Sequence, residues 1–233
     1  MEKTKLTGRI VTRDDPDYNE ARTNINLSLE RYPDIIVFCQ NKQDALNALK
    51  WARENRVPFR IRGGRHSYEN FSLLNNGLVI DLSEMKKITV NQDKKLAYIE
   101  AGAELGEVYR TLWQYGLTLP AGTIANVGLT GLTLGGGIGL LTRAAGLTCD
   151  SLVQLEMIVA DEKEGADLIT VSCSNHPDLF WASQGGGGGN FGIVTSMTFK
   201  AVPISQVSIF SITWGWDDFE EVFNTWQRWA PFT

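Results

Sequence analysis

The stretch that decides the fold is Arg60-Ile61-Arg62-Gly63-Gly64-Arg65-His66-Ser67-Tyr68. It places a histidine on a glycine turn between two apolar runs of strand length, Val57 to Ile61 and Gly77 to Leu82. Glycines let a backbone approach a phosphate closely, and successive N–H groups in such a turn form an anion nest. A neutral imidazole is a nucleophile at ordinary pH. The turn therefore predicts a diphosphate cofactor that is both bound and covalently captured, although an isolated turn of this kind would more often be an ordinary loop.

The composition bounds the class of protein. A chain of 233 residues with 43% hydrophobic and 21% charged residues is ordinary for a globular protein of one large or two small domains. The formal net charge of −5 argues against nucleic acid as a partner, because nucleic-acid binding needs a basic surface. The basic residues that do cluster, Arg60, Arg62 and Arg65, suit a small anionic ligand.

Cysteine usage and hydropathy exclude further classes. The cysteines, Cys39, Cys149 and Cys173, are too scattered for a metal or redox motif, so we expect no metal site and no disulfide framework. The N-terminus lacks the apolar core of a signal peptide. Glycines and Arg143 interrupt the most apolar stretch, Val127 to Leu147, so we expect no membrane span.

The first third of the chain alternates between helix and strand patterns. We expect a polar-faced helix from Tyr18 to Glu30, then a strand from Pro33 to Cys39. A helix from Asp44 to Asn55 and strands over Pro58 to Arg62 and Leu78 to Leu82 should follow. This order predicts a small α/β lobe with the glycine turn at the end of its second strand.

The remainder is richer in strands. The expected elements, in chain order, are a strand from Leu96 to Ala101, a helix from Leu105 to Tyr115, strands from Leu152 to Ala160 and from Asp167 to Cys173, a short helix from Asp178 to Ser183, and a strand from Gly192 to Ala201.

Two further glycine clusters invite a nucleotide interpretation. Gly187 to Gly192 matches G-x-G-x-x-G, but a helix pattern precedes it and a strand pattern follows, the reverse of a Rossmann site. Pro120 to Gly139 is long, apolar and rich in glycine, which suits close contact with a flat heteroaromatic ligand. A buried, close-packed loop without a ligand is the alternative for the second cluster.

These motifs together resemble the FAD-linked oxidases of the vanillyl-alcohol oxidase and p-cresol methylhydroxylase (PCMH) superfamily, in particular bacillary members of the berberine-bridge-enzyme-like branch. The resemblance covers about residues 15–205. The matching segments, in order, are Pro33–Val37, Arg62–Tyr68, Pro120–Gly122, Val127–Gly128, Gly135–Gly139, Arg143–Asp150, Pro177–Ala182 and Gly187–Val194.

The resemblance implies an α+β class and a two-lobed PCMH-type FAD-binding fold, with a small α/β lobe, a larger β-rich lobe and the start of a substrate domain. The expected divisions are an N-terminal helical segment over 1–32, an FAD-binding domain over 33–203 with lobes of about 33–90 and 91–203, and the beginning of a truncated substrate domain over 204–233.

The resemblance also implies a set of cofactor-binding residues. The diphosphate of FAD would lie on the backbone of residues 62–67, the flavin ring against 127–139, and the adenine side near 192–194. His66 would bond covalently to the flavin 8α carbon. The full set is Arg62, Gly63, Gly64, Arg65, His66, Ser67, Tyr68, Pro120, Gly122, Val127, Gly128, Thr130, Gly131, Gly135, Gly136, Gly137, Gly139, Gly192, Ile193 and Val194.

Three positions matter when the chain is compared with the family pattern. Ile124 stands where bicovalent members carry a cysteine, so the resemblance implies a link through His66 alone. Arg65 replaces the glycine common just before the histidine. Val127 falls on the position that gates oxygen access to the flavin, and its small side chain implies an oxidase.

The last thirty residues carry an unusual pattern. Val207 to Trp214 resembles the first strand of a new sheet. A stripe at helical spacing follows, consisting of Phe219, Val222, Phe223, Trp226, Trp229 and Ala230. Burial stabilises each large apolar side chain by about 1.5–3 kcal/mol, so this stripe should need a partner. Relatives are about twice as long, so we expect the chain to be an amino-terminal portion, with the catalytic base beyond Thr233.

The leading interpretation is an FAD-dependent oxidoreductase that takes hydride from a substrate C–H or alcohol group to flavin N5 and passes electrons to O₂, giving H₂O₂. Its partners would be a small-molecule substrate, O₂ and the C-terminal half of the same protein. The alternatives are a flavin-binding fragment without turnover and a coat or scaffold protein that retains the fold. Sugars, aromatic alcohols and alkaloids all suit the family as substrates. A cytoplasmic or spore-associated location in a bacterium is expected.

Overall fold

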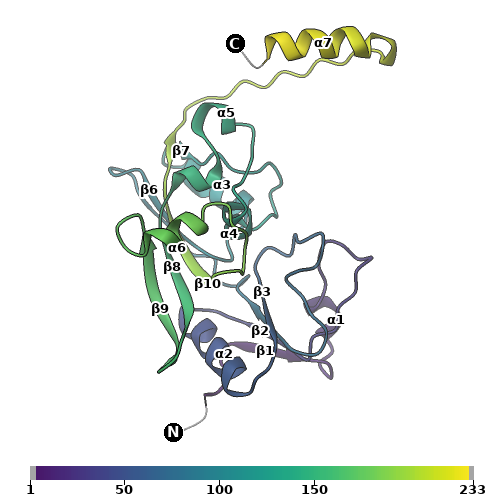
Figure 1. Ribbon diagram of the computed structural model, residues 1–233. Helices are drawn as coiled ribbons and strands as arrows, with labels where there is room; N and C mark the ends of the chain where they lie inside the picture. The colour runs from purple at the N-terminus through teal and green to yellow at the C-terminus, as the bar shows by residue number, and fades with distance from the viewer. Residues whose placement is uncertain (1–3, 231–233) are drawn as a thin grey trace.

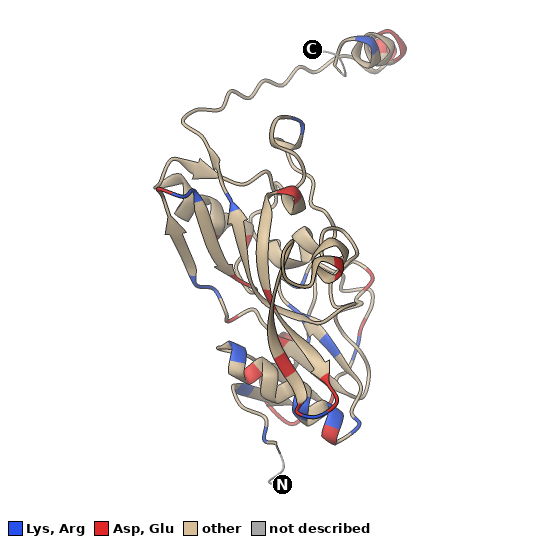
Figure 2. Cartoon of the chain, turned by 60° about the vertical axis from the view of Figure 1, so that its left-hand side comes forward, with Lys and Arg blue, Asp and Glu red and all other residues tan. Residues whose placement is uncertain are grey.

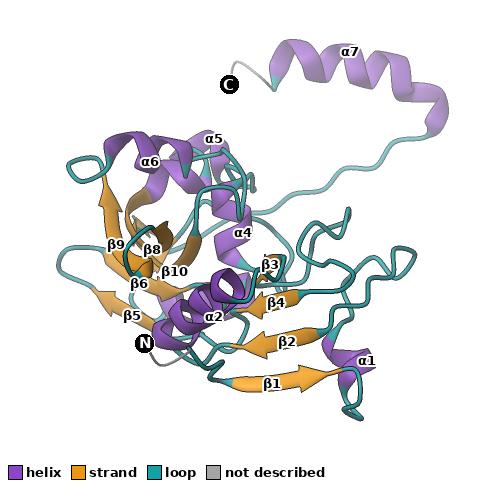
Figure 3. Ribbon diagram, turned by 60° about the horizontal axis from the view of Figure 1, so that its bottom comes forward, coloured by secondary structure: helices purple, strands orange, loops and turns teal. Residues whose placement is uncertain are grey.

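A mixed four-stranded sheet forms the first lobe of the computed structural model, which describes residues 4–230. The strand order is β1-β2-β4-β3 (Figure 3). Strand β1 (Arg9–Thr12) runs antiparallel to β2 (Ile35–Phe38), whereas β4 (Leu78–Asp81) is parallel to both β2 and β3 (Phe59–Arg62). Strand β3 is therefore an edge strand, and its carboxyl end leads directly into the glycine turn.

Helix α2 (Lys42–Glu54) makes the crossover between the parallel strands β2 and β3. It begins where the Asn41 side chain accepts hydrogen bonds from the backbone N–H groups of Gln43 and Asp44, at 2.9 and 3.1 Å. Ala45, Ala48, Leu49 and Ala52 then repeat at helical spacing and are buried. This local pattern explains why the expected helix over 44–55 is confirmed almost to its ends.

The N-terminal segment differs from expectation. Helix α1 covers Tyr18–Ala21, so the prediction of a helix to Glu30 is wrong beyond its first turn, and the supposed helical segment also contains β1. Tertiary hydrogen bonds use the groups that a longer helix would need. The N–H of Ile25 donates to the Arg65 carbonyl at 3.0 Å, and the Asn24 amide donates to Asn70 at 2.9 Å.

An antiparallel five-stranded sheet forms the second lobe, in the order β5-β6-β10-β8-β9. Its buried face packs against α3, α4 (Leu129–Leu134) and α6 to make the largest apolar cluster. The elements are β5 (Ile88–Asn91), β6 (Leu96–Glu100), α3 (Leu105–Trp113), β8 (Leu152–Asp161), β9 (Gly165–Ser172), α6 (Pro177–Ala182) and β10 (Ile193–Lys200), with a small separate pair made by β7 (Leu117–Thr118) and β11 (Val202–Pro203).

The two lobes share a core. Ala45 and Leu49 of α2 belong to the same apolar cluster as Ile158 of β8 and Ile193 of β10. An ion pair between Lys42 of α2 and Glu156 of β8, 3.1 Å long, crosses the same boundary. The α+β, two-lobed arrangement expected from the sequence is therefore confirmed.

The glycine-rich segment over 120–139 is not a continuous loop. Residues Leu129–Leu134 form α4, followed by the short helices α5 (Thr142–Ala145) and η1 (Thr148–Ser151). Leu129, Thr133 and Leu134 are buried, and this burial outweighs the cost of about 1 kcal/mol for Gly131 inside the helix. Glycine content alone indicated a loop here, and that was wrong for these six residues.

The C-terminal residues leave the body of the molecule. An extended segment leads away from the two sheets and carries η2 (Trp216–Asp218) and α7 (Phe219–Trp229). Helix α7 lies beyond α5 (Figure 1). The expected helix is confirmed as α7, but the strand expected over 207–214 is absent from the described residues. A strand forms only where a neighbouring strand supplies hydrogen bonds, and no described strand pairs with residues 207–214.

Acidic and basic residues occur along the chain in both lobes (Figure 2). Within residues 4–230, no helix is long and apolar enough to cross a membrane. The same part of the chain holds no group of three or more His, Cys, Asp or Glu side chains that could bind a metal ion.

Candidate cofactor-binding cleft

A cleft of about 1200 Å³ lies between the lobes. One wall consists of β3 and the glycine turn that follows it, and the other of residues around α4 and the loop before β10. Typical pockets for drug-sized ligands have volumes of roughly 300–1,000 Å³. The cleft therefore has room for a large, elongated cofactor.

The glycine turn presents unsatisfied backbone donors to this cleft. Within residues 4–230, none of the N–H groups from Gly64 to Ser67 donates a hydrogen bond to a protein group. These residues are partly buried and line the cleft, so their N–H groups are available to a ligand that enters it. Successive free N–H groups suit the oxygens of a phosphate or diphosphate.

Close packing holds the turn in place. A Cβ atom added to Gly64 would lie 2.2 Å from the backbone nitrogen of Gly128 in the other lobe. The segment that contains Gly128 is itself fixed, because Leu105 N donates to the Val127 carbonyl at 3.0 Å and Leu129 N donates to the Ala103 carbonyl at 3.0 Å. The two glycine motifs singled out in the sequence thus contact each other directly.

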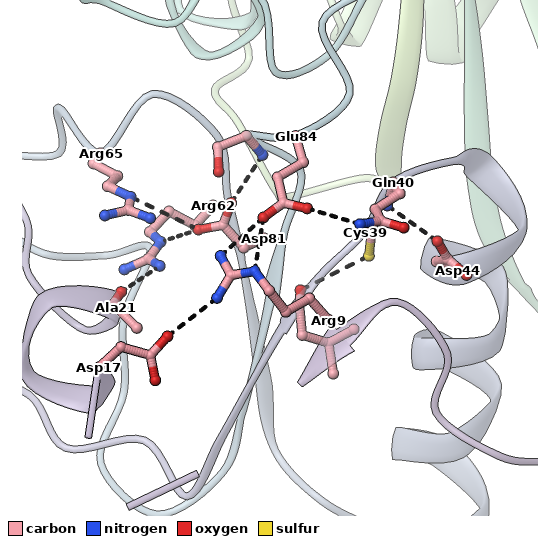
Figure 4. Close-up of polar contacts among 12 residues, drawn as sticks. Arg9, Asp17, Ala21, Cys39, Gln40, Asp44, Arg62, Arg65, Asp81 and Glu84 are labelled. Atoms are coloured by element: carbon pink, nitrogen blue, oxygen red, sulfur yellow. Dashed lines mark hydrogen bonds and ion pairs between the residues drawn. The ribbon is translucent and has the colours of Figure 1, made fainter. Parts of the chain in front are cut away.

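A buried ion pair supports the turn from below. The Arg62 Nε donates to Asp81 Oδ2 at 2.5 Å, and its Nη2 donates to the Ala21 carbonyl at 2.7 Å (Figure 4). Burial lowers the pKa of the Arg62 guanidinium, the Asp81 carboxylate opposes that shift, and the neighbouring charge of Arg65 adds to it. The Arg62 side chain is thus structural in this geometry rather than part of the cleft wall, where the sequence had suggested it.

His66 lies on the cleft side of the turn and is partly buried. Among the described residues no protein group is hydrogen-bonded to its imidazole, so both ring nitrogens remain available. Arg65, just before it, has a φ of +59°, in the left-handed region. Ser67 Oγ accepts a hydrogen bond from Phe71 N at 3.0 Å, which fixes the chain on the other side of the histidine.

The charge of the cleft is positive. Of the described residues that line it, Arg60 and Arg65 carry full positive charges, and none is an aspartate or a glutamate. Leu82, Ala101, Val127 and Leu132 add apolar surface. The wall combines positive charge and free N–H donors near the turn with apolar area elsewhere, which fits a ligand with a diphosphate and flat ring systems.

The structure brings together twelve of the residues that the sequence suggested for cofactor binding. They line one continuous cleft although they come from three distant parts of the chain. These residues are Gly63, Gly64, Arg65, His66, Ser67, Tyr68, Val127, Gly128, Thr130, Gly131, Gly192 and Val194.

Eight other suggested residues do not line the cleft, namely Arg62, Pro120, Gly122, Gly135, Gly136, Gly137, Gly139 and Ile193. Packing explains two of these glycines. A Cβ on Gly139 would lie 1.8 Å from the Ala121 carbonyl oxygen, and one on Gly137 would lie 2.3 Å from Thr148 Oγ1. Ile193 points into the core shared by the lobes.

Sequence reasoning missed much of the cleft wall. Val57 to Ile61 line it along the open edge of β3, and Gly187 to Asn190 line it from the other lobe. The glycine run was rejected as a Rossmann site, and that rejection stands, because α6 precedes it and β10 follows. The signal that could have found it is the run of five glycines, three of which have positive φ angles.

A two-lobed α+β fold, with a glycine turn and a histidine beside the cleft between the lobes, is typical of PCMH-type FAD-binding domains. A family profile described as "FAD binding domain" matches residues 33–164. The chain belongs to this family of FAD-binding proteins.

Relatives agree with this assignment. The FAD-linked oxidoreductase YgaK of Bacillus subtilis (strain 168) is 99% identical over 233 residues, a match that covers 100% of this chain and 52% of YgaK. The structure of 6-hydroxy-D-nicotine oxidase from Arthrobacter nicotinovorans superposes with a TM-score of 0.81 at 28% identity, covering 86% of this chain and 43% of that one. The structure of the BBE-like 1 protein of Physcomitrella patens gives 0.81 at 33% identity, covering 85% and 43%.

The chain spans about half the length of the curated relatives it matches.

Proposed function

We propose that the protein is an FAD-linked oxidase in which His66 holds the flavin covalently. The observation that carries this proposal is the run of free N–H groups from Gly64 to Ser67 beside the unpartnered imidazole. A bound FAD supplies the hydride acceptor for a substrate C–H or alcohol group, and its reoxidation by O₂ gives H₂O₂.

The chain's own residues bind and orient that cofactor. The N–H groups of the turn bind the diphosphate, and a neutral imidazole of His66 is the nucleophile that bonds to the flavin. Val127, Gly128 and Gly131 offer a wall with little side-chain bulk, which allows a ring system to lie close to the backbone.

The general base belongs to another part of the whole protein. Such a base must lie within hydrogen-bond reach of the proton that it removes. The described residues of the cleft include no carboxylate, and His66 is assigned to the cofactor. The proposal therefore places the base, and the groups that select the substrate, outside residues 4–230.

The histidine link can be tested with a matched pair of variants. Natural full-length protein should show the mass of an FAD adduct, and acid precipitation should leave the yellow colour in the pellet. His66→Ala should release all flavin on denaturation. His176→Asn should keep the adduct, because His176 is the other histidine of the chain and does not line the cleft.

Asparagine suits that control because His176 has a φ of +56° and asparagine tolerates the left-handed region. Colour that stays bound in the His66→Ala protein would refute the assignment. Colour with no substrate-dependent H₂O₂ would instead indicate a flavin-binding protein without turnover, and a colourless protein would indicate a scaffold.

A further inference from the structure

Two guanidinium groups share one buried carboxylate beneath the glycine turn (Figure 4). Asp81 Oδ2 accepts from Arg62 Nε at 2.5 Å, whereas Arg65 Nε is 4.0 Å away. The other oxygen of Asp81 accepts from Ser83 N at 2.8 Å. Arg62 therefore already pairs with Asp81, and Arg65 is too distant to form a hydrogen bond with it.

Among the described residues, Asp81 is the one carboxylate within 4.0 Å of either Arg62 or Arg65. Arg62 and Arg65 contribute two positive charges against one negative charge from Asp81, and Arg62 Nη1 is buried without a hydrogen-bond partner. The neighbouring carboxylates of Glu84 and Asp17 both pair with Arg9, at 2.8 and 3.4 Å. The Arg65 guanidinium donates no hydrogen bond to a described protein group, so its donors are available to an anion at the turn.

The backbone at Arg65 adopts a conformation that glycine reaches more easily than arginine. A φ of +59° is uncommon for a residue other than glycine, asparagine or aspartate, and it carries strain. Glycine would adopt it freely, yet the chain has arginine here. The side chain is one-third exposed, and the residue lines the cleft.

We propose that Arg65 is a diphosphate-binding side chain. Its guanidinium lies beside the glycine turn, with Nε 4.0 Å from Asp81 and Cζ 5.6 Å from the centroid of the Phe38 ring, while Arg62 donates the hydrogen bond to Asp81. This inference rests on the proposed function, since it names a side chain for the diphosphate that the free N–H groups also bind. Arginine suits the role because its planar fork donates to two phosphate oxygens at once.

The test measures binding rather than turnover. Natural full-length protein carrying His66→Ala serves as the parent, because its flavin should be exchangeable. Dissociation constants for FAD and for riboflavin, which lacks phosphate, are measured by fluorescence quenching in the parent and in Arg65→Gln, Arg65→Lys and Arg65→Gly. The matched control is Arg9→Gln, since Arg9 also lies over the Phe38 ring, 3.7 Å from its centroid, but does not line the cleft.

Arg65→Gln and Arg65→Gly should weaken FAD binding by roughly 10- to 100-fold, the range for loss of one charge-assisted hydrogen-bonding group, and leave riboflavin binding unchanged. Arg65→Lys should retain part of the FAD affinity, and Arg9→Gln all of it. The FAD affinity of the parent should fall more steeply with salt than that of Arg65→Gln. Arg65→Gly should unfold at no lower temperature than the parent, because glycine relieves the strain.

Unchanged FAD affinity in Arg65→Gln would overturn this inference and leave the proposed function intact. Equal losses for FAD and riboflavin would also overturn it, since they would show a structural effect on the cleft. A parent that binds neither flavin would overturn the proposed function itself, and this inference with it.

Discussion

Gly64 and Gly128 lie backbone to backbone across the boundary between the lobes. The contact is reciprocal, because a Cβ on Gly128 would lie 2.8 Å from the nitrogen of Gly64. Neither contact can be relieved by turning a side chain, since the obstructing atoms are backbone. The spacing of the lobes, and with it the width of the cleft, therefore depends on glycine at both positions.

Alanine at either position should separate the lobes. Overpacking costs typically about 1–3 kcal/mol, and backbone contacts should place these variants at the upper end. We expect Gly64→Ala and Gly128→Ala to lower the unfolding temperature and to weaken flavin retention. Differential scanning fluorimetry and flavin absorbance of the purified protein would measure both effects.

Gly131→Ala is the matched control for stability. A Cβ on Gly131 would meet nothing within 4 Å, and the residue lies inside α4. Alanine there should be neutral or stabilise the fold by up to about 1 kcal/mol. Equal losses of stability in all three variants would show that the contact between the lobes has no special weight.

The sequence predicts those parts of the fold that depend on local pattern. Helix α2 carries its own cap at Asn41 and its own apolar face, and β2, β3 and β4 are short apolar runs with clear boundaries. Strand β5 was missed, because Ile88–Asn91 alternates half-buried and exposed residues over four positions and depends on β6 for its hydrogen bonds.

Only the part of the cleft that depends on local sequence could be predicted. The glycine turn is local, so its residues could be identified, whereas the facing wall at Gly187–Asn190 is brought near by the fold of the second lobe. The resemblance placed Arg62 in the site through the backbone of the turn, and its charge clusters in sequence with those of Arg60 and Arg65. Its side chain instead turns toward Asp81, a partner nineteen residues away that no spacing rule indicates.

Access of oxygen to the flavin should depend on Val127. The residue is partly buried, lines the cleft and directly precedes Gly128. Leucine would fill space that a diatomic gas needs, and a steric barrier of about 1–3 kcal/mol slows a step by roughly five- to 150-fold. Stopped-flow reoxidation of the reduced flavin in air should therefore be slower in Val127→Leu and no slower in Val127→Ala.

Equal reoxidation rates in the wild type, Val127→Leu and Val127→Ala would exclude a gate at this residue. The flavin content of each variant must be matched first, because Val127 also contributes to the cofactor wall.

Stability toward acid should depend on Glu156, which joins the lobes. Although its partial burial raises the pKa of this carboxyl, hydrogen bonds from Ser196 and Lys42 more than offset the effect and hold the pKa below its ordinary value. A carboxyl with a depressed folded-state pKa stabilises the fold above its unfolded pKa, and this contribution is lost as the pH falls through the folded value. Glu156→Gln should therefore flatten the fall in unfolding temperature between about pH 6 and 3.

Lys42→Met separates the ion pair from the other contacts of Glu156. It should remove part of the same pH dependence, and the double variant should be no flatter than Glu156→Gln alone, because the two residues share one interaction. Additive effects in the double variant would show that Lys42 and Glu156 act independently.

An isolated 1–233 fragment should be poorly behaved in solution because of α7. Trp216, Phe219, Phe223 and Trp226 stack in a row, with ring centroids 5.1, 5.5 and 6.2 Å apart, and all four are more than two-fifths exposed. An exposed apolar stripe of this size marks an interaction surface, which we assign to the remainder of the whole protein.

The fragment should bind a hydrophobic dye, self-associate in analytical ultracentrifugation and form no H₂O₂ from substrates that the whole protein oxidises. Trp226→Glu should reduce dye binding and association, whereas Gln227→Glu, which adds the same charge at the adjacent position, should not. A monomeric fragment with full oxidase activity would show that both the partner for α7 and the general base lie within these 233 residues.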